Sequence, residues 1–377
     1  MARLEEICDI LDSRRIPITA SDRKPGPYPY YGANGIQDYV SDYIFDDELV
    51  LLAEDGGNFG SKEKPIAYRV SGKCWVNNHA HVLKPKDMLD VDYLCYSLMF
   101  YDVSGLVNGA TRQKLTQADM RKMEIPLRPM SEQKRITAVI NKVSDLISLC
   151  KQQLTKLDEL VKARFVELFG DPIDNPKGLP VKTLKELSTL ITNGNTPKGG
   201  SENYVDNGIL FLRSQNIWRN RIELDDVAYI DEATHRSLKK SSLKHKDILI
   251  TKTGRINTEN SSLGRAALYL GADDSANING HVYLVRLDGS VVPEYVVTIL
   301  TSEAYRKYIR KVCVGGIDKR QINLDQVEDF PIILPSVEMQ EQFAAFVKQT
   351  DKSKLAIQQS LDKMELLKKA LMQKYFA

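Results

Sequence analysis

Two long segments of the chain repeat apolar residues in alternating steps of four and three positions. The first begins at Ser131, a suitable helix N-cap, and ends at Phe169, just before a glycine and a proline, Gly170 and Pro172. Such steps place one apolar stripe along one face of a helix. The sequence therefore predicts a long helix with a coiled-coil seam formed by Ile136, Ile140, Val143, Ile147, Cys150, Leu154, Leu157 and Val161.

The second segment lies at the end of the chain and follows the same steps. Polar residues interrupt its seam at Thr350, Lys354 and Lys368, between the apolar positions Phe343, Val347, Ile357, Leu361, Met364, Leu371 and Tyr375. Two such helices in one chain can cover each other's stripes as an antiparallel pair. A helix of about 39 residues spans roughly 58 Å, on the order of 17 base pairs of duplex DNA. Taken alone, heptad segments of this kind more often dimerise a chain or dock a partner.

The stretches before each helix mix short strand signals with turns. Apolar runs at 50–52, 248–250 and 282–285 are bounded by Gly and Asn, as buried strands are. We expect an α+β domain in each stretch. The predicted organisation is a first domain over residues 1–127, a long helix over 128–170, a second domain over 171–335 and a second long helix over 336–377.

The chain also repeats itself once. Leu4-Glu5-Glu6-Ile7 matches Leu184-Lys185-Glu186-Leu187 at an offset of 180 positions, and Asn77-Asn78-His79-Ala80-His81-Val82 matches Asn277-Ile278-Asn279-Gly280-His281-Val282 at an offset of 200. Gly109-Ala110-Thr111-Arg112-Gln113-Lys114-Leu115 resembles the segment from Gly315 to Ile322, and proline pairs precede both helices. Ordered landmarks with a growing offset predict an internal duplication with an approximate two-fold axis, and insertions in loops of the second copy.

Composition adds little beyond a folded protein of two domains. The chain has 377 residues, of which 42% are hydrophobic and 27% charged. A net charge of +2 neither requires nor excludes nucleic acid, because the footprint depends on where the charges lie. Without a membrane span or a basic signal segment, we expect a cytoplasmic protein. The scattered cysteines, without a C-x-x-C pair, are interpreted as reduced thiols, mostly in the core: Cys8, Cys74, Cys95, Cys150 and Cys313.

In the first copy, an aromatic run enters a glycine turn at 28–35 and brings flat rings next to an amide. Asn amides read adenine, tyrosines stack or contact phosphates, and Arg pairs with guanine. A plain hairpin corner is the alternative interpretation. The candidate DNA-binding residues of this copy are Tyr30, Tyr31, Asn34, Asn58, Asn78, Arg112 and Lys114.

In the second copy, the place equivalent to the aromatic run holds Arg213-Ser214-Gln215-Asn216, and a basic loop recurs after a glycine turn. Arg265 stands among Ser and Asn in the same enlarged region. Singly, such charges are more often solvated surface. The candidates of this copy are Arg213, Gln215, Asn216, Lys252, Arg255, Lys319 and Arg320, whereas His79, His81 and His281 are interpreted as structural.

The sequence predicts no catalytic centre. It lacks the Asn/Asp-Pro-Pro-aromatic signature of amino-methyltransferases and the G-x-x-x-x-G-K-[ST] phosphate loop. The glycine cluster at 56–60 fits no nucleotide-binding spacing, and the acids Asp247 and Glu259 lie in no metal-binding pattern. We expect neither a bound metal nor a cofactor in this chain.

The order domain, proline pair, long helix, repeated once, resembles the specificity subunits of type I restriction-modification systems. Local strings carry the same resemblance: residues 31–36, 76–83, and Ile125-Pro126-Leu127 into Glu132-Gln133. The resemblance implies two target recognition domains, each reading one half of a split DNA sequence. It also implies that the helices set the spacing and bind methyltransferase subunits, two in number, which restriction subunits join.

On this resemblance the chain itself is not an enzyme, and S-adenosylmethionine, ATP and Mg belong to partner subunits. Since the first domain begins almost at Met1, closure of a circular arrangement would come from the helix ending at Ala377. Two alternatives stay open. One is a duplicated coiled-coil scaffold that binds proteins and no DNA, and the other is the specificity chain of a related system whose partner combines methylation and cleavage.

Overall fold

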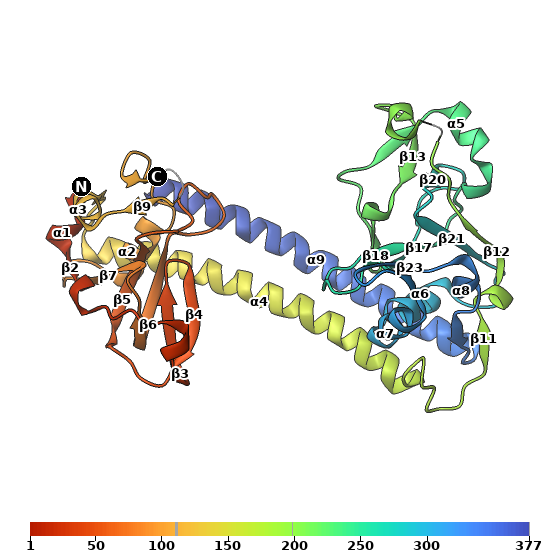
Figure 1. The fold of residues 1–377 in the computed structure, drawn as a ribbon, viewed down its shortest axis with the longest axis horizontal. Helices are drawn as coiled ribbons and strands as arrows, with labels where there is room; N and C mark the ends of the chain where they lie inside the picture. Colours follow the sequence, from red (N-terminus) through yellow and green to blue (C-terminus); the bar gives the residue numbers. More distant parts are fainter. Residues whose placement is uncertain (110–111, 198, 377) are drawn as a thin grey trace. The chain divides into compact units, whose positions relative to one another are not determined.

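The computed structural model describes residues 1–109, 112–197 and 199–376 and divides the chain into two compact units (Figure 1). Unit 1 comprises Met1–Gln153 and Ile357–Ala377, and unit 2 comprises Leu154–Ala356. The long helices α4 (Met130–Phe169) and α9 (Val337–Phe376) contribute residues to both units. Ala110 and Thr111 of the repeated glycine segment, and Ala377, lie outside the described residues.

Unit 1 is built on a six-stranded sheet in the order β2-β7-β5-β6-β3-β4. These strands are β2 (Cys8–Ile10), β3 (Pro25–Gly32), β4 (Gly35–Val40), β5 (Phe45–Ala53), β6 (Ala67–Val76) and β7 (Ala80–Pro85). Alternate residues of β5 face opposite sides of the sheet, so Val50 and Leu52 join one core cluster while Leu49 and Leu51 join another. The sheet is therefore covered on both faces.

Shorter elements complete unit 1. They are β1 (Ala2–Arg3), α1 (Leu4–Ile7), α2 (Val91–Met99), β8 (Val107–Asn108), β9 (Lys114–Leu115), α3 (Gln117–Lys122) and β10 (Glu124–Ile125). Helix α2 begins at the N-cap Asp90, whose side chain accepts a hydrogen bond from the Tyr93 amide. It packs on β5 and β6.

Unit 2 contains a four-stranded sheet, β12-β21-β17-β19, and a three-stranded sheet, β16-β13-β20. Its strands are β11 (Val181–Thr183), β12 (Ser188–Asn193), β13 (Ile209–Leu212), β14 (Ile217–Trp218), β15 (Arg221–Ile222), β16 (Ala228–Ile230), β17 (Ile248–Thr251), β18 (Thr253–Arg255), β19 (Ala266–Leu268), β20 (Ala276–Ile278), β21 (Val282–Leu287), β22 (Val314–Gly315), β23 (Lys319–Gln321) and β24 (Pro331–Ile333). Its short helices are α5 (Glu232–Ser237), α6 (Pro293–Thr301), α7 (Glu303–Val312) and α8 (Leu324–Glu328). The α+β class is confirmed for both units.

Matching hydrogen bonds confirm the internal duplication. The Asn77 amide donates to the Tyr31 carbonyl in unit 1, and the Asn279 amide donates to the Leu212 carbonyl in unit 2, at 3.0 Å each. The side chains of the same two asparagines accept from the amides of His79 and His281. Asn77 therefore corresponds to Asn279, an offset of 202 positions.

The sequence alignment at an offset of 200 is accordingly wrong by two residues. It paired Asn77 with Asn277 and His81 with His281, because the two His-containing strings look alike. The strand register decides otherwise: His81 lies opposite Leu52 on β5, and Tyr283 lies opposite Ile250 on β17. A shift by two keeps every side chain on the same face of a strand, so polarity alone could not reveal it.

Most of the extra length of the second copy lies between β13 and β17. Tyr31 of unit 1 corresponds to Leu212 of unit 2, because their carbonyls accept equivalent hydrogen bonds from Asn77 and Asn279. Ala53 corresponds to Thr251, because their backbone amides each donate to the carbonyl of the residue just before a neighbouring strand. The added stretch forms β14, β15, β16 and α5. The prediction of insertions in the second copy is thus confirmed.

Both long helices are present, and their seams are more buried than the flanking positions. Ile136, Ile140 and Val143 are buried, and the seam continues through half-buried residues to Phe165 and Phe169. In α9 the polar interruption Thr350 is only 5% exposed. Within unit 1 Lys151 pairs with Glu365 at 2.8 Å, and within unit 2 Asp158 pairs with Lys354 at 2.6 Å.

A buried glutamine fastens each long helix to its domain. Gln133 of α4 accepts from the Asp90 amide at 2.8 Å and donates to the carbonyl of Arg128. Gln340 of α9 repeats this arrangement with the Val292 amide at 3.0 Å. Both amides are almost fully buried. The duplicated unit is therefore a domain together with the start of its helix.

The cysteines are free, and four of the five are buried, as predicted, while Cys150 is half-buried. Among the described residues, no helix has the length and apolar character needed to cross a membrane.

Candidate nucleic-acid interface

In unit 1 the predicted polar residues gather around the loop that follows β5. The side-chain amide of Asn34 donates a hydrogen bond to the Gly56 carbonyl at 3.0 Å, and Asn58 lies within the same loop. Arg112 and Lys114 reach it from the β8–β9 segment: Arg112 pairs with Asp55 at 2.8 Å and Lys114 with Glu54 at 3.0 Å. The fold thus collects residues up to 80 positions apart on one edge of the sheet.

Asp55 contacts two basic side chains at this edge. Its Oδ1 lies 2.6 Å from His79 Nδ1 and 2.8 Å from Arg112 Nη2. Asn78, next to His79, is exposed on the same turn. Because the pair between Arg112 and Asp55 is exposed, a DNA phosphate can compete for the guanidinium at low cost.

The two tyrosines are less accessible than predicted. Tyr30 is only 1% exposed, its hydroxyl bonds the backbone of Ile18, and the Arg23 guanidinium lies 4.2 Å over its ring. A ring buried in this way has no free face for a base, so Tyr30 serves the core. Tyr31 is half-buried, and burial raises the pKa of its hydroxyl.

Behind the loop lies a buried ionic network. His81 is fully buried, and its two ring nitrogens lie 2.6 Å from Asp12 Oδ2 and 2.9 Å from the Leu115 carbonyl oxygen. Burial alone would raise the pKa of Asp12, but hydrogen bonds from His81 and Gln117 outweigh it and hold that pKa below its usual value. The structural interpretation of His81 is confirmed.

The same cluster offers three metal-ligand types, since ligand atoms of Asp12, Glu54 and His81 lie within 4.8 Å of one another. Two cations already occupy it, however. Arg15 Nη1 lies 2.6 Å from Glu54 Oε2, and Lys114 Nζ lies 3.0 Å from Glu54 Oε1. These charges would repel a divalent ion, so the cluster is better described as an ion-pair network.

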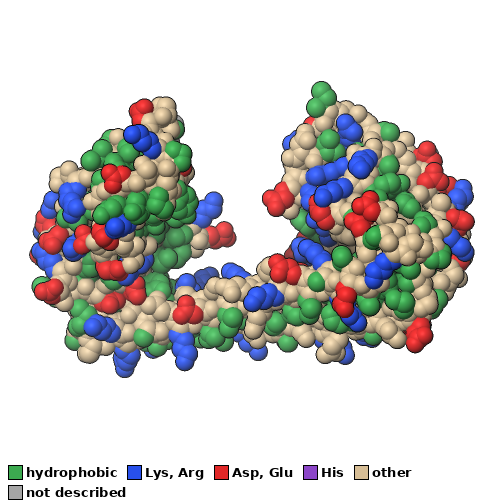
Figure 2. Space-filling view, turned by 90° about the horizontal axis from the view of Figure 1, so that it is seen from below, with side chains coloured by type: hydrophobic (Ala, Val, Ile, Leu, Met, Phe, Trp, Pro, Cys, Tyr) green, Lys and Arg blue, Asp and Glu red, His purple; other side chains and the backbone are tan. Residues whose placement is uncertain are grey.

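In unit 2 the basic candidates lie on a small ribbon of three strands, β18, β23 and β22. Arg255 pairs across the ribbon with Lys319 in register, and Gly254 with Arg320. Arg255 and Lys319 are exposed. Lys252 lies just before β18, and its ammonium nitrogen is 5.7 Å from the centroid of the Tyr283 ring. Figure 2 shows groups of Lys and Arg side chains on the face of unit 2 that is turned to the viewer.

The other candidates of unit 2 surround Asp226. Arg213 donates to the Asp226 carbonyl at 2.8 Å, and Gln215 bonds the Asp226 carboxylate. Asn216 is 2% exposed and caps a short turn, with its amide on the carbonyls of Glu223 and Asp226. Asn216 is therefore a structural residue, whereas Gln215 is exposed and Arg213 is half-buried.

The equivalent turns Asn77–His79 and Asn279–His281 form the centre of both candidate surfaces. In unit 2 the Lys252 amide bonds the His281 carbonyl, as the Glu54 amide bonds that of His79 in unit 1. The turn therefore links the residues around Asp226, through Leu212, to the ribbon of β18, β23 and β22. His281 itself is exposed.

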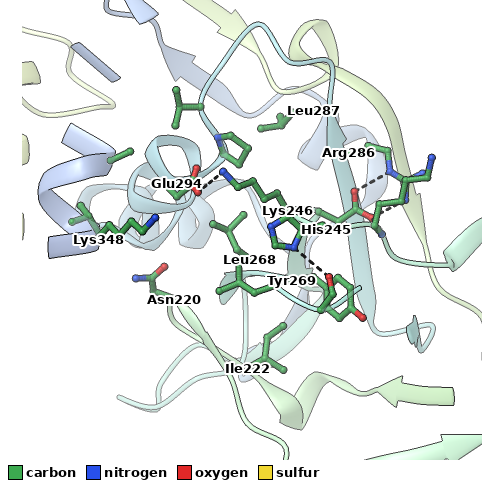
Figure 3. Close-up of a pocket in the computed structure, with 18 of the residues that line it drawn as sticks. Asn220, Ile222, His245, Lys246, Leu268, Tyr269, Arg286, Leu287, Glu294 and Lys348 are labelled. Atoms are coloured by element: carbon green, nitrogen blue, oxygen red, sulfur yellow. Dashed lines mark hydrogen bonds and ion pairs between the residues drawn. The ribbon is translucent and has the colours of Figure 1, made fainter. Parts of the chain in front are cut away.

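A pocket of about 1420 Å³ in unit 2 is a separate feature (Figure 3). It is lined by apolar residues such as Ile222 and Leu268, and its lining contains two ion pairs, Lys246 with Glu294 and Arg286 with Asp247, at 2.7 Å each.

Sequence reasoning missed the loop Ile256–Ser261 and the arginines Arg306 and Arg310, which bond two of its carbonyls. It also assigned Arg265 to possible phosphate contact, yet Arg265 is 8% exposed and donates to Ser261. The available signal was weak: a polar run between two glycines, and two arginines four positions apart in the sequence.

The fold and the two surfaces define a duplicated protein in which each domain presents a polar sheet edge that carries basic residues. The sequence profile described as type I restriction modification DNA specificity domain matches residues 1–159 and 176–366. The chain belongs to this family. It is a non-catalytic component with a role in DNA sequence specificity within a restriction-modification complex.

Individual relatives agree. The chain is 38% identical over 145 residues to a putative type I restriction enzyme specificity subunit of Haemophilus influenzae, an alignment that covers 38% of this chain and 37% of that protein. It is 21% identical to the MjaVIII specificity subunit of Methanocaldococcus jannaschii over 99% of this chain and 90% of that protein. The crystal structure of the S subunit of a type I system from M. genitalium is similar in fold, with a TM-score of 0.63 and 14% identity, covering 100% and 95% of the two chains.

Proposed function

We propose that each unit reads one half of a bipartite DNA sequence through the sheet edge centred on its Asn77–His79 or Asn279–His281 turn. One observation carries the proposal: the two edges share their backbone hydrogen bonds and the Asn and His of the central turn, but the polar side chains around that turn differ. Asn34, Asn78, Arg112 and Lys114 populate the first. The second carries Arg213, Gln215, Lys252, Arg255, Lys319 and Arg320. A common scaffold with different readers is what recognition of two unlike half-sites requires.

Recognition divides between two kinds of contact. Lysines and arginines of the edges neutralise phosphates, which gives affinity that falls with salt. Asparagine, glutamine and arginine side chains that reach base edges give discrimination of about 1–3 kcal/mol per good bidentate pair. Because both units belong to one chain, binding of the second half-site is intramolecular, and two weak affinities multiply.

We further propose that the outer faces of α4 and α9 bind two methyltransferase subunits, which restriction subunits then join. Large apolar side chains are exposed on these helices although the seam is covered: Val139, Leu149, Leu160, Val166, Leu355 and Leu366. Such residues are typical of surfaces that a partner buries. The methyl donor, ATP and Mg belong to those partners on this proposal.

The test is binding of the full chain to duplex DNA of random sequence, measured as a function of salt. We expect log K to fall linearly with log salt, and the slope to lose about 0.9 for each phosphate contact removed. Lys319→Ala and Arg112→Ala each remove one exposed cation from a candidate edge. Arg164→Ala, which removes a partly exposed cation from α4, is the matched control and should leave the slope unchanged.

A binding constant independent of salt, or equal slopes for all three variants and the native chain, would exclude these edges as the DNA interface. If the chain binds other proteins but no DNA, the result would instead favour the alternative of a coiled-coil scaffold.

A further inference from the structure

The loop Ile256–Ser261 of unit 2, here called the clamped loop, is held by its backbone carbonyls. Arg265 Nε donates to the Ser261 carbonyl at 3.0 Å, and its Nη2 donates to that of Asn260. Arg306 donates to Glu259 at 2.7 Å, and Arg310 donates to Ile256 at 2.9 Å. Three guanidinium groups thus bond four of its carbonyls, and bonds from charged donors are the stronger class of hydrogen bond.

The guanidinium groups come from rigid places. Arg265 immediately precedes β19 and stacks on Trp218, with its Cζ 3.9 Å from the ring centroid. Arg306 and Arg310 lie four positions apart on α7, whose Tyr305 and Ile309 are buried in the core. A Cβ at Gly254, the residue before Arg255, would lie 2.3 Å from the Leu263 amide nitrogen, so the two ends of the loop approach very closely.

The side chains of residues 257–260 are exposed, whereas Ile256 packs against the core and Ser261 is buried. Asn257, Thr258 and Asn260 are exposed, and within the described ranges the amides of Asn257 and Asn260 have no hydrogen-bond partner. The loop follows directly on β18, so its exposed side chains continue the edge formed by Arg255 and Lys319. Asn pairs bidentately with adenine, and Thr bonds base edges of either kind or contacts the thymine methyl group.

A plain surface connection would not need this support. Burial lowers the pKa of Arg265, and the positive charge of Arg219 acts in the same direction while Glu223 opposes it, so neither water nor the net effect of neighbouring charges favours the guanidinium at this position. Yet most of the loop's own side chains lie outside the core, with Ser261 alone buried. The hydrogen bonds of the clamp therefore fix the backbone that carries the exposed side chains. A loop that is already ordered loses less conformational entropy on binding.

We propose that the clamped loop reads bases in the half-site bound by unit 2, with Asn257, Thr258 and Asn260 as reading residues and Arg265, Arg306 and Arg310 as positioning residues. This rests on the proposed DNA-binding function and names the residues that specify sequence within it. In unit 1 Ile66 stands at the place of Arg265, since its carbonyl accepts from Ala53 as that of Arg265 accepts from Thr251. The clamp is thus a property of the second copy.

The test is selection of bound duplexes from a random-sequence pool by the full chain, followed by sequencing. The native chain should enrich two half-sites separated by a fixed spacer. Asn257→Ala with Asn260→Ala should lose discrimination by about 10-fold to 100-fold at one or two positions of one half-site and leave the other half-site intact. An unchanged pair of half-sites would overturn the clamped loop as a reader while leaving the proposed function in place.

The positioning role has its own readout. Arg310→Ala should speed amide hydrogen exchange across 256–261 and relax the same half-site, and Arg310→Lys should restore part of the discrimination. Lys311→Ala, an exposed cation on the same helix, is the matched control and should change neither. If Arg310→Ala leaves both exchange and sequence preference unchanged, the positioning role is refuted. If the native chain enriches no sequence at all, the proposed function fails together with the loop.

Discussion

At the scale of single residues, the Asp12 carboxylate contributes to the stability of unit 1. It bonds the fully buried His81, the Gln117 amide and the backbone amide of Val82, and it is itself 7% exposed. Its pKa in the folded state lies below the ordinary value. Stability from this group is therefore fully present above the unfolded pKa of about 3.9 and is lost as the pH falls through the folded pKa.

Asp12→Asn should consequently destabilise unit 1 by about 1–3 kcal/mol at pH 7, and the gap to the native chain should shrink below about pH 4. Urea unfolding at several pH values measures it, in a Trp218→Phe background that leaves Trp75 as the sole tryptophan, within unit 1. Asp87→Asn, at an exposed carboxylate, is the control. A gap that stays constant from pH 7 to pH 3 would contradict this account.

At the scale of elements, the joint between a domain and its helix is a buried amide. Gln133 satisfies the Asp90 amide and the carbonyls of Met88 and Arg128 in one place. Leucine has nearly the same volume but no polar atoms, so Gln133→Leu would remove the side-chain partner of all three groups at a fully buried position.

We expect Gln133→Leu to lower the free energy of unfolding of unit 1 by about 1–3 kcal/mol. The rate of amide hydrogen exchange should increase most at the start of α4 and around Asp90. Gln152→Leu, at an exposed position of the same helix, should be close to neutral. Equal effects of the two substitutions would show that the joint does not depend on the buried amide.

At the scale of the whole molecule, the proposed function makes the long helices a measure of distance along DNA. Insertion of one heptad into α4 between Lys151 and Leu160, with a matching heptad in α9 between Lys354 and Leu361, keeps both seams in phase. Each insertion adds about 10 Å, or about three base pairs. Duplex selection should then return the same half-sites with a longer spacer, and an unchanged spacer in an insertion variant that still binds would remove the ruler.

Exchange of residues 1–127 for the corresponding part of a relative tests modularity. The proposed division of labour requires that one half-site change and the other persist, because the readers of each half-site lie in one unit. Sequencing of selected duplexes is again the measurement. A change in both half-sites, or in neither, would contradict independent reading.

The sequence by itself determined the features that depend on local periodicity. The seams from Ile136 to Val161 and from Phe343 to Tyr375 follow from heptad steps, because helix geometry fixes which residues share a face. The duplication followed from ordered similar strings, and the absence of a catalytic signature followed from motifs that are short and contiguous.

Only the tertiary structure decided which polar residues meet. The register of β7 and β21 moved the repeat to an offset of 202, and burial removed Tyr30 and Asn216 from the surface. The clamped loop depends on bonds from Arg306 and Arg310 to carbonyls about 50 positions away. Hydrogen bonds across such separations leave no periodic trace in a sequence, because they are set by the packing of whole elements rather than by neighbours along the chain.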